Sequence, residues 1–389
     1  MKPGMLKRPR DGRLDTLRGL FLVIMTIDHL AGYISRFTFE SFGFVSAAAG
    51  FVLLSGYMYG MHGDSGQTTL APRFRKVMHR VGTLYRYQVF IVLFLFAGAA
   101  LSSVYGGYWS RTIDIPGSSI AASFLYALVL LHQPPFLDIL PMYIFFLLLT
   151  PFVQLAFHRN LQLLVLVLSL SLWLLGQYVD PLELLSAVSG VAPRIGVFNL
   201  FAWQLLWIGG LYAGYLHGTC QQNNLLQKPA WLFIASATAI VFFLARHDVI
   251  AVPPALALQF DKSDLRILRV VNTLCLVTLA CWIIKLLPIS FKVPVVSTLG
   301  RYSLQVLAVH IVLLYLAQPV FWRMQAIGVG AETVFSLGII VALWMTIPAY
   351  QLYLKSKTRL FGRRTLAGIA GDGMRQLMTR VETAIKQRQ

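Results

Sequence analysis

The chain has 389 residues, of which 57% are hydrophobic and 12% are charged. Soluble domains carry about 25% charged residues, so this composition excludes an ordinary soluble enzyme and favours a membrane protein. The formal net charge of +18 arises from Lys and Arg gathered before residue 14, at 73–80 and after residue 354. Basic residues in this pattern are typical of cytoplasmic segments that contact anionic lipid. We therefore expect membrane lipid to be a partner of these segments, and we expect no nucleic acid.

Apolar runs of about 20 residues recur along the chain, which is the length that a helix needs to cross a bilayer. They predict an all-α polytopic membrane protein with about ten transmembrane helices. Because cytoplasmic loops are enriched in Lys and Arg, the basic segments predict that both termini are cytoplasmic. We expect one membrane domain at 1–354, followed by a basic cytoplasmic tail at 355–389. The predicted transmembrane helices lie near 15–36, 42–61, 84–106, 137–157, 161–178, 197–217, 230–246, 267–287, 298–318 and 333–354.

The first predicted transmembrane helix carries ionisable side chains, which are costly in lipid and usually face a bundle interior or a wet cavity. Arg18 and His29 are eleven residues apart, so they share one helix face and lie about 16 Å apart along the axis. Asp15 precedes Arg18 by about one turn, and Asp28 points about 100° away from His29. Because imidazole titrates near neutral pH, His29 suits proton transfer. We interpret His29, with Asp28 beside it, as the catalytic candidate; the alternative is a plain hydrogen bond to a neighbouring helix.

Residues 70–86 mix basic and apolar side chains in the pattern of an amphipathic helix on the cytoplasmic membrane surface. One interpretation is that this helix anchors the chain to lipid. The other is that its arginines bind the phosphate groups of a ligand, because a guanidinium matches phosphate geometry. The spacing favours neither interpretation.

The segment 136–151 begins with Asp138 and has Pro141 three residues later. Aspartate caps free N–H groups and proline fits the first turn, so this pair predicts the start of a helix. Capping alone explains both residues. By the predicted topology, Asp138 lies at the extracytoplasmic end of that helix.

The segment 198–210 begins another predicted helix on the extracytoplasmic side with Asn199, Trp203 and Gln204. Aromatic residues at this depth usually form an interfacial belt. Aromatic rings and amides also suit the faces and hydroxyl groups of a carbohydrate. Both interpretations stay open for these three residues.

The segment 299–310 contains Gly-Arg-Tyr-Ser and ends in a histidine. Arg301 lies at the predicted cytoplasmic edge of a transmembrane helix. Ser303 and His310 are seven residues apart, so they fall about 20° apart on one helix face. We treat these two residues as secondary candidates, behind His29.

These segments, taken in chain order, resemble a known family. Arg18, ten residues and then His29 is similar to the Arg/Lys-X10-His signature of the acyltransferase-3 superfamily of integral membrane acyltransferases. One branch, the OpgC family, adds succinyl groups to osmoregulated periplasmic glucans. The segments that resemble this branch are Arg-Leu-Asp-x-x-Arg-Gly at 13–19, Asp-Ile-Leu-Pro-Met-Tyr at 138–143, Asn-x-x-x-Trp-Gln-Leu at 199–205 and Gly-Arg-x-Ser at 300–303.

The resemblance implies an acyl-CoA-dependent acyltransferase of the bacterial inner membrane. The enzyme would move an acyl group from cytoplasmic acyl-CoA to a hydroxyl of an extracytoplasmic glucan. Succinyl is the acyl group expected of the branch, and acetyl is the commonest in the wider superfamily. We expect acyl-CoA as a donor substrate, with no permanently bound cofactor and no metal, since the three cysteines lack metal-ligand spacing.

The resemblance also implies roles for the candidate residues. His29 and Asp28 would be catalytic, and Asp15, Arg18 and Arg301 would bind the donor. The residues expected to face the acceptor are Asp138, Tyr143, Asn199, Trp203 and Gln204.

Two questions stay open at the level of sequence. His29 would act either as a general base on the sugar hydroxyl or as a nucleophile that carries the acyl group as an acyl-imidazole. A proton-coupled transporter or flippase would also carry internal Asp, His and Arg residues, so it is the alternative function.

Overall fold

The structure is a computed structural model that describes residues 11–63, 69–113, 119–181, 183–184, 187, 196–219, 228–353 and 356. The chain divides into two compact units, Met1–Ile340 and Val341–Gln389. The described residues are helical or lie in turns and loops, and none of them forms a β-strand. Apart from Ser356, the predicted tail at 355–389 lies outside the described residues.

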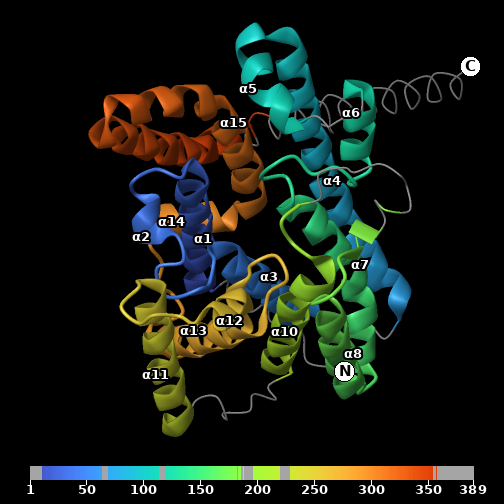
Figure 1. Cartoon of the computed structure of the whole chain (residues 1–389). Helices are drawn as coiled ribbons and strands as arrows, with labels where there is room; N and C mark the ends of the chain where they lie inside the picture. The colour runs from blue at the N-terminus through green and yellow to red at the C-terminus, as the bar shows by residue number, and fades with distance from the viewer. Residues whose placement is uncertain are drawn as a thin grey trace, which may run out of the picture. The chain divides into compact units, whose positions relative to one another are not determined.

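Helices form most of the first unit (Figure 1). Short connections, including α2 and α12, bring the ends of longer helices close together. The helices are α1 (Gly12–Leu30), α2 (Ser35–Thr38), α3 (Ala47–Gly63), α4 (Leu70–Leu101), α5 (Ser103–Ile113), α6 (Ile120–Leu128), α7 (Ile139–His158), α8 (Gln162–Leu175), α10 (Leu200–Gly218), α11 (Pro229–Arg246), α12 (Pro254–Ala257), α13 (Ile267–Leu286), α14 (Pro294–Arg301) and α15 (Ser303–Ile327).

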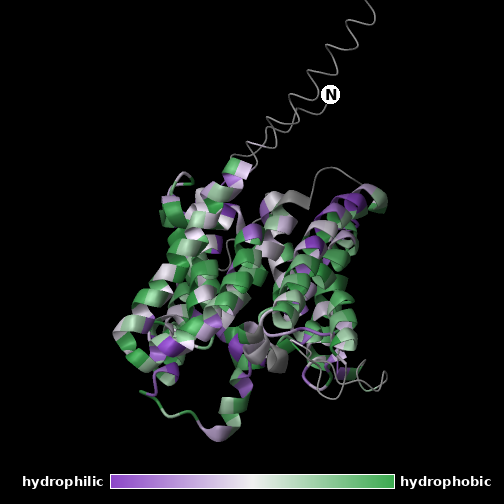
Figure 2. Ribbon diagram, turned by 90° about the horizontal axis from the view of Figure 1, so that it is seen from above, coloured by the Kyte–Doolittle hydropathy of each residue, from purple (hydrophilic) through white to green (hydrophobic). Residues whose placement is uncertain are grey.

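Within the described residues, six helices are long and apolar enough to cross a membrane: α4, α7, α11, α13, α15 and the helix Val329–Tyr353. Figure 2 shows hydrophobic residues predominating along the helices. In α11 and α13 only 22% of the most apolar stretch is buried, and exposed apolar faces of this length are suited to lipid. The prediction of an all-helical membrane protein is therefore confirmed. The count of about ten spans and the cytoplasmic termini stay predictions.

The helix boundaries differ from the prediction most clearly at α4, α1 and the α14–α15 junction. The basic segment at 70–86 and the span expected at 84–106 form one continuous helix, α4. Buried Val77, Val81 and Leu84 follow at helical spacing, so one stripe runs through the expected boundary. Helix α1 ends at Leu30, short of residue 36, because Ala31 adopts a left-handed backbone conformation with φ of 54°. The span expected at 298–318 is split at Tyr302 between α14 and α15.

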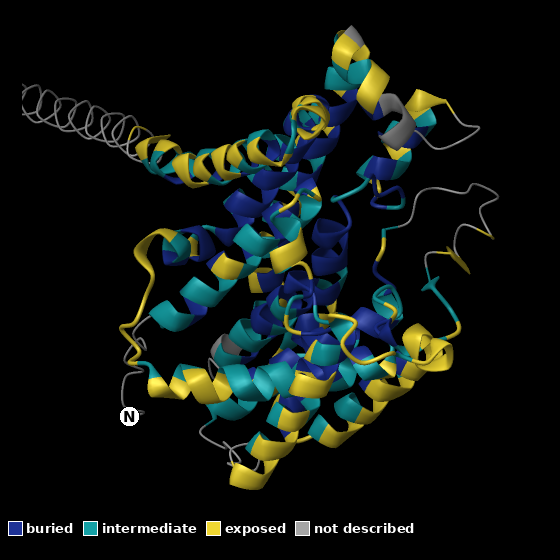
Figure 3. Cartoon of the chain, turned by 60° about the vertical axis from the view of Figure 1, so that its left-hand side comes forward, coloured by how far each residue is buried: buried dark blue, intermediate teal, exposed yellow. Residues whose placement is uncertain are grey.

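Helix α1 lies against α14, α15 and α3, and it carries buried residues along its length (Figure 3). Its contact with α14 depends on Gly19 and Gly300. A side chain on Gly19 would collide with the backbone of Val296, and one on Gly300 would collide with the backbone of Asp15. Small residues allow such close approach of helix backbones. The start of α1 is fixed by Asp11, whose carboxylate accepts a hydrogen bond from the backbone N–H of Arg13 at 3.0 Å.

Helices α3 and α10 form the second close crossing. Gly56 and Gly60 on α3 approach the backbone of α10, and Gly210 and Gly214 on α10 approach the backbone of α3. Each pair has the small-xxx-small spacing of tightly packed membrane helices. This crossing brings the start of α3 and the start of α10 to the same end of the unit as the C-terminus of α1.

Candidate active site

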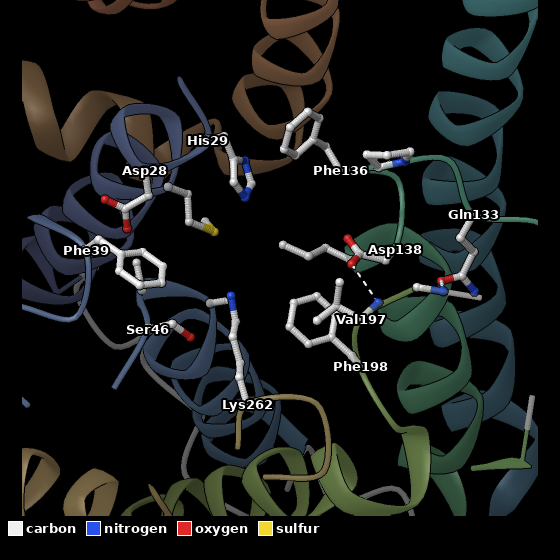
Figure 4. Close-up of a pocket in the computed structure, with 16 residues that line it drawn as sticks. Asp28, His29, Phe39, Ser46, Gln133, Phe136, Asp138, Val197, Phe198 and Lys262 are labelled. Atoms are coloured by element: carbon white, nitrogen blue, oxygen red, sulfur yellow. Dashed lines mark hydrogen bonds between the residues drawn. The ribbon is translucent and has the colours of Figure 1, made fainter. Parts of the chain in front are cut away.

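A cavity of about 380 Å³ lies among the C-terminal turn of α1, the start of α3 and the segments that precede α7, α10 and α13 (Figure 4). This volume lies within the roughly 300–1,000 Å³ range of small-molecule sites. Its lining combines apolar side chains with polar ones. The polar members are Asp28, His29, Ser46, Gln133, Asp138 and Lys262.

His29 is joined to His310, a residue 281 positions later in the chain. Nδ1 of His29 lies 3.3 Å from Nε2 of His310, and Nδ1 of His310 lies 2.7 Å from the carbonyl oxygen of Leu307. A carbonyl oxygen only accepts hydrogen bonds, so Nδ1 of His310 carries a proton and Nε2 of neutral His310 is an acceptor. Nδ1 of His29 must then donate. This order leaves Nε2 of neutral His29 unprotonated, with a lone pair.

Nε2 of His29 forms no hydrogen bond within the part of the chain that the structure describes, and His29 lines the cavity. The ring is held on its other side by Phe136, whose ring centroid lies 4.6 Å away. Phe136 precedes α7 in a backbone conformation with φ of 70°. The position of His29 is thus set by its place in the last turn of α1, by Phe136 and by His310.

The two carboxylates of the cavity have separate partners. Asp28 accepts a hydrogen bond from Oγ1 of Thr38 at 2.6 Å, and Asp138 accepts one from the backbone N–H of Val197 at 3.3 Å. Asp138 makes no side-chain capping bond to α7, so capping does not account for it. Burial raises the pKa of the Asp138 carboxyl, and the Val197 hydrogen bond opposes that rise. The Oε1 of Gln133 accepts from the N–H of Gly196 at 3.1 Å, which ties the same two segments together.

Lys262 enters the cavity from the loop before α13, and its amine lies on the side opposite His29 (Figure 4). Its Nζ lies 5.7 Å from the centroid of the Phe198 ring. The loop is held by Trp203, whose Nε1–H lies 3.1 Å from the carbonyl oxygens of both Lys262 and Ser263. Burial lowers the pKa of the Lys262 amine, while the charges of Glu40, Asp138 and Asp28 act in the opposite direction.

Comparison with known proteins decides the family. The family model described as OpgC protein matches residues 10–354. This chain belongs to the OpgC family. No curated protein and no solved structure matches it. The range matched to the OpgC family includes the whole cavity, His310 and the helices from α1 to α15.

In this OpgC family member, the residues of the Trp-Gln-Leu run build the wall behind the cavity and do not line it. Nδ2 of Asn199 donates to the carbonyl oxygens of Gly176 and Val179 at 2.8 and 3.1 Å, and its Oδ1 caps the start of α10. Gln204 Oε1 accepts a hydrogen bond from Ser169 Oγ at 2.7 Å and joins α10 to α8. Trp203 supports the Lys262 loop.

Arg18 lies toward the opposite end of α1. Its guanidinium stacks over the ring of Phe51 at 5.6 Å, and its Nη1 lies 3.4 Å from Sδ of Met58. Its Nε is buried and has no hydrogen-bond partner among the described residues. Arg18 of α1 interacts electrostatically with Arg80 of α4, so two cations lie near each other at this end of α1.

The remaining predicted residues lie outside the cavity lining. Tyr143 is buried in α7 and donates to the carbonyl oxygen of Phe51 at 3.1 Å, close enough to Arg18 to interact with it electrostatically. Asp15 is buried in the first turn of α1. Arg301 is exposed at the end of α14, and Ser303 is buried at the start of α15.

Sequence reasoning missed Ser46, Gln133 and Lys262 as members of the site. Each lies in a connection or at a helix start, where neither periodicity nor a motif marks it. The one available signal was that the loop before α13 is charged and lies by prediction on the same side as Asp138. Among the described residues, no group of three His, Cys, Asp or Glu side chains is placed to hold a metal ion.

Proposed function

We propose that this OpgC family member is a membrane O-acyltransferase that moves a succinyl group from cytoplasmic acyl-CoA to a hydroxyl of an extracytoplasmic glucan. Membership of the OpgC family supports a transferase. The observation that carries the proposal is His29, whose Nε2 lone pair is directed by the His310–Leu307 hydrogen bonds and adjoins a polar cavity. The same features extend the proposal to the acyltransferase-3 superfamily, whose Arg/Lys-X10-His signature Arg18 and His29 resemble.

The proposed topology has about ten spans in the bacterial inner membrane, with both termini in the cytoplasm. The cavity is lined by the connection after α1 and by the connections before α7, α10 and α13. In a chain that crosses the membrane repeatedly, these connections fall on one side, and the basic segment at 70–80 falls on the other. The positive-inside rule makes the cavity side extracytoplasmic, which is where a glucan is available.

The proposed chemistry begins at Nε2 of His29. This nitrogen takes the proton of a sugar hydroxyl while the hydroxyl oxygen forms a C–O bond to the thioester carbonyl carbon. When the tetrahedral intermediate collapses, the C–S bond breaks and the imidazolium returns its proton to the departing thiolate. The products are a sugar ester and free CoA. Asp28, the other predicted catalytic residue, borders the same cavity and accepts a hydrogen bond from Thr38.

Arg18 and Arg80 form the proposed donor end. The two guanidinium groups share a site that also includes the hydroxyl-bearing rings of Tyr59 and Tyr143. Neighbouring cations favour a multiply charged anion, and arginine suits phosphate. The distance along α1 from Arg18 to His29 is about 16 Å, so an extended pantetheine arm would connect phosphates at Arg18 to a thioester at His29.

The cavity has groups that suit a sugar. Asp28 and Asp138 accept hydrogen bonds from hydroxyl groups, and Ser46 has a buried Oγ that finds no hydrogen-bond partner among the described residues. The rings of Phe39 and Phe198 offer apolar faces beside them. The predicted acceptor role is therefore proposed for Asp138, while Asn199, Trp203 and Gln204 support the wall.

The test is thiol release by the full-length protein in nanodiscs, measured with succinyl-CoA and a β-glucan acceptor. We expect acceptor-dependent release by the wild type and loss of at least about 100-fold in His29→Ala, the usual range for a general base. His158→Ala, an exposed histidine at the end of α7, is the matched control and should keep the wild-type rate. Equal rates for His29→Ala and wild type would refute the assignment of the chemistry to His29.

The competing functions give different results in the same preparation. A proton-coupled transporter would show glucan or proton flux in proteoliposomes and no thiol release. An acyl-imidazole route would leave a mass increase of one succinyl group on the protein when glucan is omitted, and that increase would be absent in His29→Ala. The general-base route predicts no such adduct.

A further inference from the structure

Lys262 is a cation inside the cavity with no ion-pair contact to any described residue. Its Nζ faces the ring of Phe198 at 5.7 Å and is directed into the space below His29 (Figure 4). A weakly hydrated ammonium beside an aromatic ring is costly unless an anion compensates it. Because no carboxylate among the described residues forms an ion pair with this ammonium, its N–H groups are open to an anionic ligand in the cavity.

Each acidic neighbour of Lys262 also has a partner of its own. Glu40 pairs with Arg269 at 2.8 Å and with Arg246 at 3.9 Å. Asp28 accepts from Thr38, and Asp138 accepts from the N–H of Val197. The charges of these three carboxylates oppose the lowering of the Lys262 pKa by burial, and none of them forms an ion pair with the amine. A ligand carboxylate would form that ion pair.

The amine lies on the side of the cavity opposite His29, which is the side that the distal end of a dicarboxylic acyl group would approach (Figure 4). The distal carboxylate of a succinyl group lies two methylene groups beyond the thioester carbonyl. A carbonyl presented to Nε2 of His29 by a donor arriving from the Arg18 end would extend its acyl chain past His29 into the cavity. Lys262 lies on the wall that such a chain would meet (Figure 4).

We infer that Lys262 is the residue that selects a dicarboxylic acyl group, by pairing its ammonium with the distal carboxylate. The inference rests on the proposed succinyl transfer and assigns the residue that recognises the acyl group. Phe198 covers one side of the ammonium, and Trp203 fixes the backbone of the loop. Both contacts hold the cation in place before a ligand binds, which increases the discrimination that it gives.

A second role for the same cation would be to stabilise the oxyanion of the tetrahedral intermediate. That role would act on every acyl donor alike, because the oxyanion is common to all thioesters. Carboxylate pairing acts on succinyl alone. Butyryl-CoA is the matched neutral donor, since a methyl group replaces the distal carboxylate at the same chain length.

The experiment compares kcat/KM for succinyl-CoA and butyryl-CoA in wild type, Lys262→Met, Lys262→Arg and Lys285→Gln. We expect wild type to prefer succinyl-CoA and Lys262→Met to lose on the order of 10- to 100-fold with succinyl-CoA alone, the value of a hydrogen bond to a charged group. Lys262→Arg should retain most of the preference. Lys285→Gln, an exposed lysine at the end of α13, should behave as wild type.

The inference would be overturned if the wild type preferred neither donor, or if Lys262→Met lost the same factor in kcat/KM with both donors. Either result would still be consistent with the proposed acyltransferase. A separate binding measurement tests the inference even if the protein has no acyltransferase activity. Monomethyl succinate and methyl butyrate are titrated against the full-length protein, and thermal stabilisation is recorded. If no donor is consumed, stabilisation by monomethyl succinate that Lys262→Met abolishes supports the inference, and its absence refutes it.

Discussion

Nδ1 of His29 lies 3.3 Å from Nε2 of His310, and this contact joins the last turn of α1 to the middle of α15. The direction of this hydrogen bond sets the tautomers of both rings. The carbonyl oxygen of Leu307 fixes which nitrogen of His310 is protonated. His310 in turn fixes which nitrogen of His29 carries a lone pair toward the cavity. His310 therefore acts through His29 and is a positioning residue.

Replacement of His310 by Ala should lower kcat with little change in KM for either substrate. Without its acceptor, Nδ1 of His29 no longer favours the protonated form, and the lone pair is divided between two tautomers and two ring orientations. We expect a fall of about 10- to 100-fold, smaller than the loss of the base itself. His310→Gln should restore much of the rate, since its amide offers a donor for Leu307 and an acceptor for His29. An equal loss in both variants would indicate a purely structural role.

Trp203→Phe should reduce donor selectivity as well as stability. The indole N–H bonds the carbonyl oxygens of Lys262 and Ser263, and Phe removes this donor. Each carbonyl oxygen keeps one backbone donor, the N–H of Leu265 at 3.3 Å and the N–H of Asn199 at 3.1 Å. The expected cost is about 0.5–1.5 kcal/mol of unfolding free energy, the net value of a lost hydrogen bond. The freed loop should also lower the ratio of kcat/KM for succinyl-CoA over butyryl-CoA.

Trp207→Phe is the control for that prediction. Trp207 is as buried as Trp203, and its indole N–H donates to Oγ1 of Thr150 at 3.1 Å. The substitution removes this hydrogen bond and does not involve the Lys262 loop. We expect a lower melting temperature with an unchanged donor ratio. If both variants change the donor ratio alike, Trp203 does not set the donor preference through the Lys262 loop.

The helical fold was predictable because apolar runs of membrane length mark helices directly. Each of the ten predicted spans falls largely on a helix, α1, α10 and α15 included. Boundaries were less predictable, because a helix ends where the backbone turns. Ala31 ends α1 through a positive φ that no residue type in the segment signals, and α4 continues through a basic segment that a membrane criterion treats as an end.

The site was predictable only in part, because its members come together through packing. His29, Asp28 and Asp138 were expected, and the cavity contains all three. Asn199, Trp203 and Gln204 fit a sugar-binding pattern, yet their amide and indole groups bond buried backbone and side chains. Lys262 was missed because its importance depends on which carboxylates are already paired, and the two ion pairs of Glu40 join residues more than 200 positions apart.

Arg269→Met should destabilise the protein strongly. It removes the 2.8 Å partner of Glu40, a carboxylate only 6% exposed, and leaves a buried charge with Arg246 at 3.9 Å. Removing one partner of a buried pair costs about 3–5 kcal/mol. The double variant Glu40→Gln/Arg269→Met should recover part of that loss, since the stranded charge is gone.

Thermal unfolding in one detergent measures both variants. Arg266→Met is the matched control, because its 3.2 Å pair with Asp264 is about one-third exposed, and such pairs contribute about 0–1 kcal/mol. If Arg269→Met lost no more thermal stability than Arg266→Met, the Glu40–Arg269 ion pair would not stabilise the fold.

The preference for succinyl-CoA should decline at alkaline pH. Burial lowers the pKa of Lys262 below its ordinary value of 10.5. As pH rises through that lowered pKa the ammonium loses its charge, whereas the distal carboxylate stays ionised, so the pairing is lost. The other charged groups that act on Lys262 are Asp28, Glu40, Asp138 and Arg269. The ratio of kcat/KM for succinyl-CoA over butyryl-CoA measures the effect, because titration of His29 cancels between donors.

Lys262→Arg separates this titration from other effects of pH. The guanidinium stays protonated throughout the range because its pKa exceeds about 12, so the ratio in that variant should stay level while the wild-type ratio falls. The decline in wild type should begin below the pH at which a solvent-exposed lysine titrates, because burial opposes the charged form. Parallel declines in the two proteins would assign the pH dependence to another group and would remove Lys262 from the selection of the acyl chain.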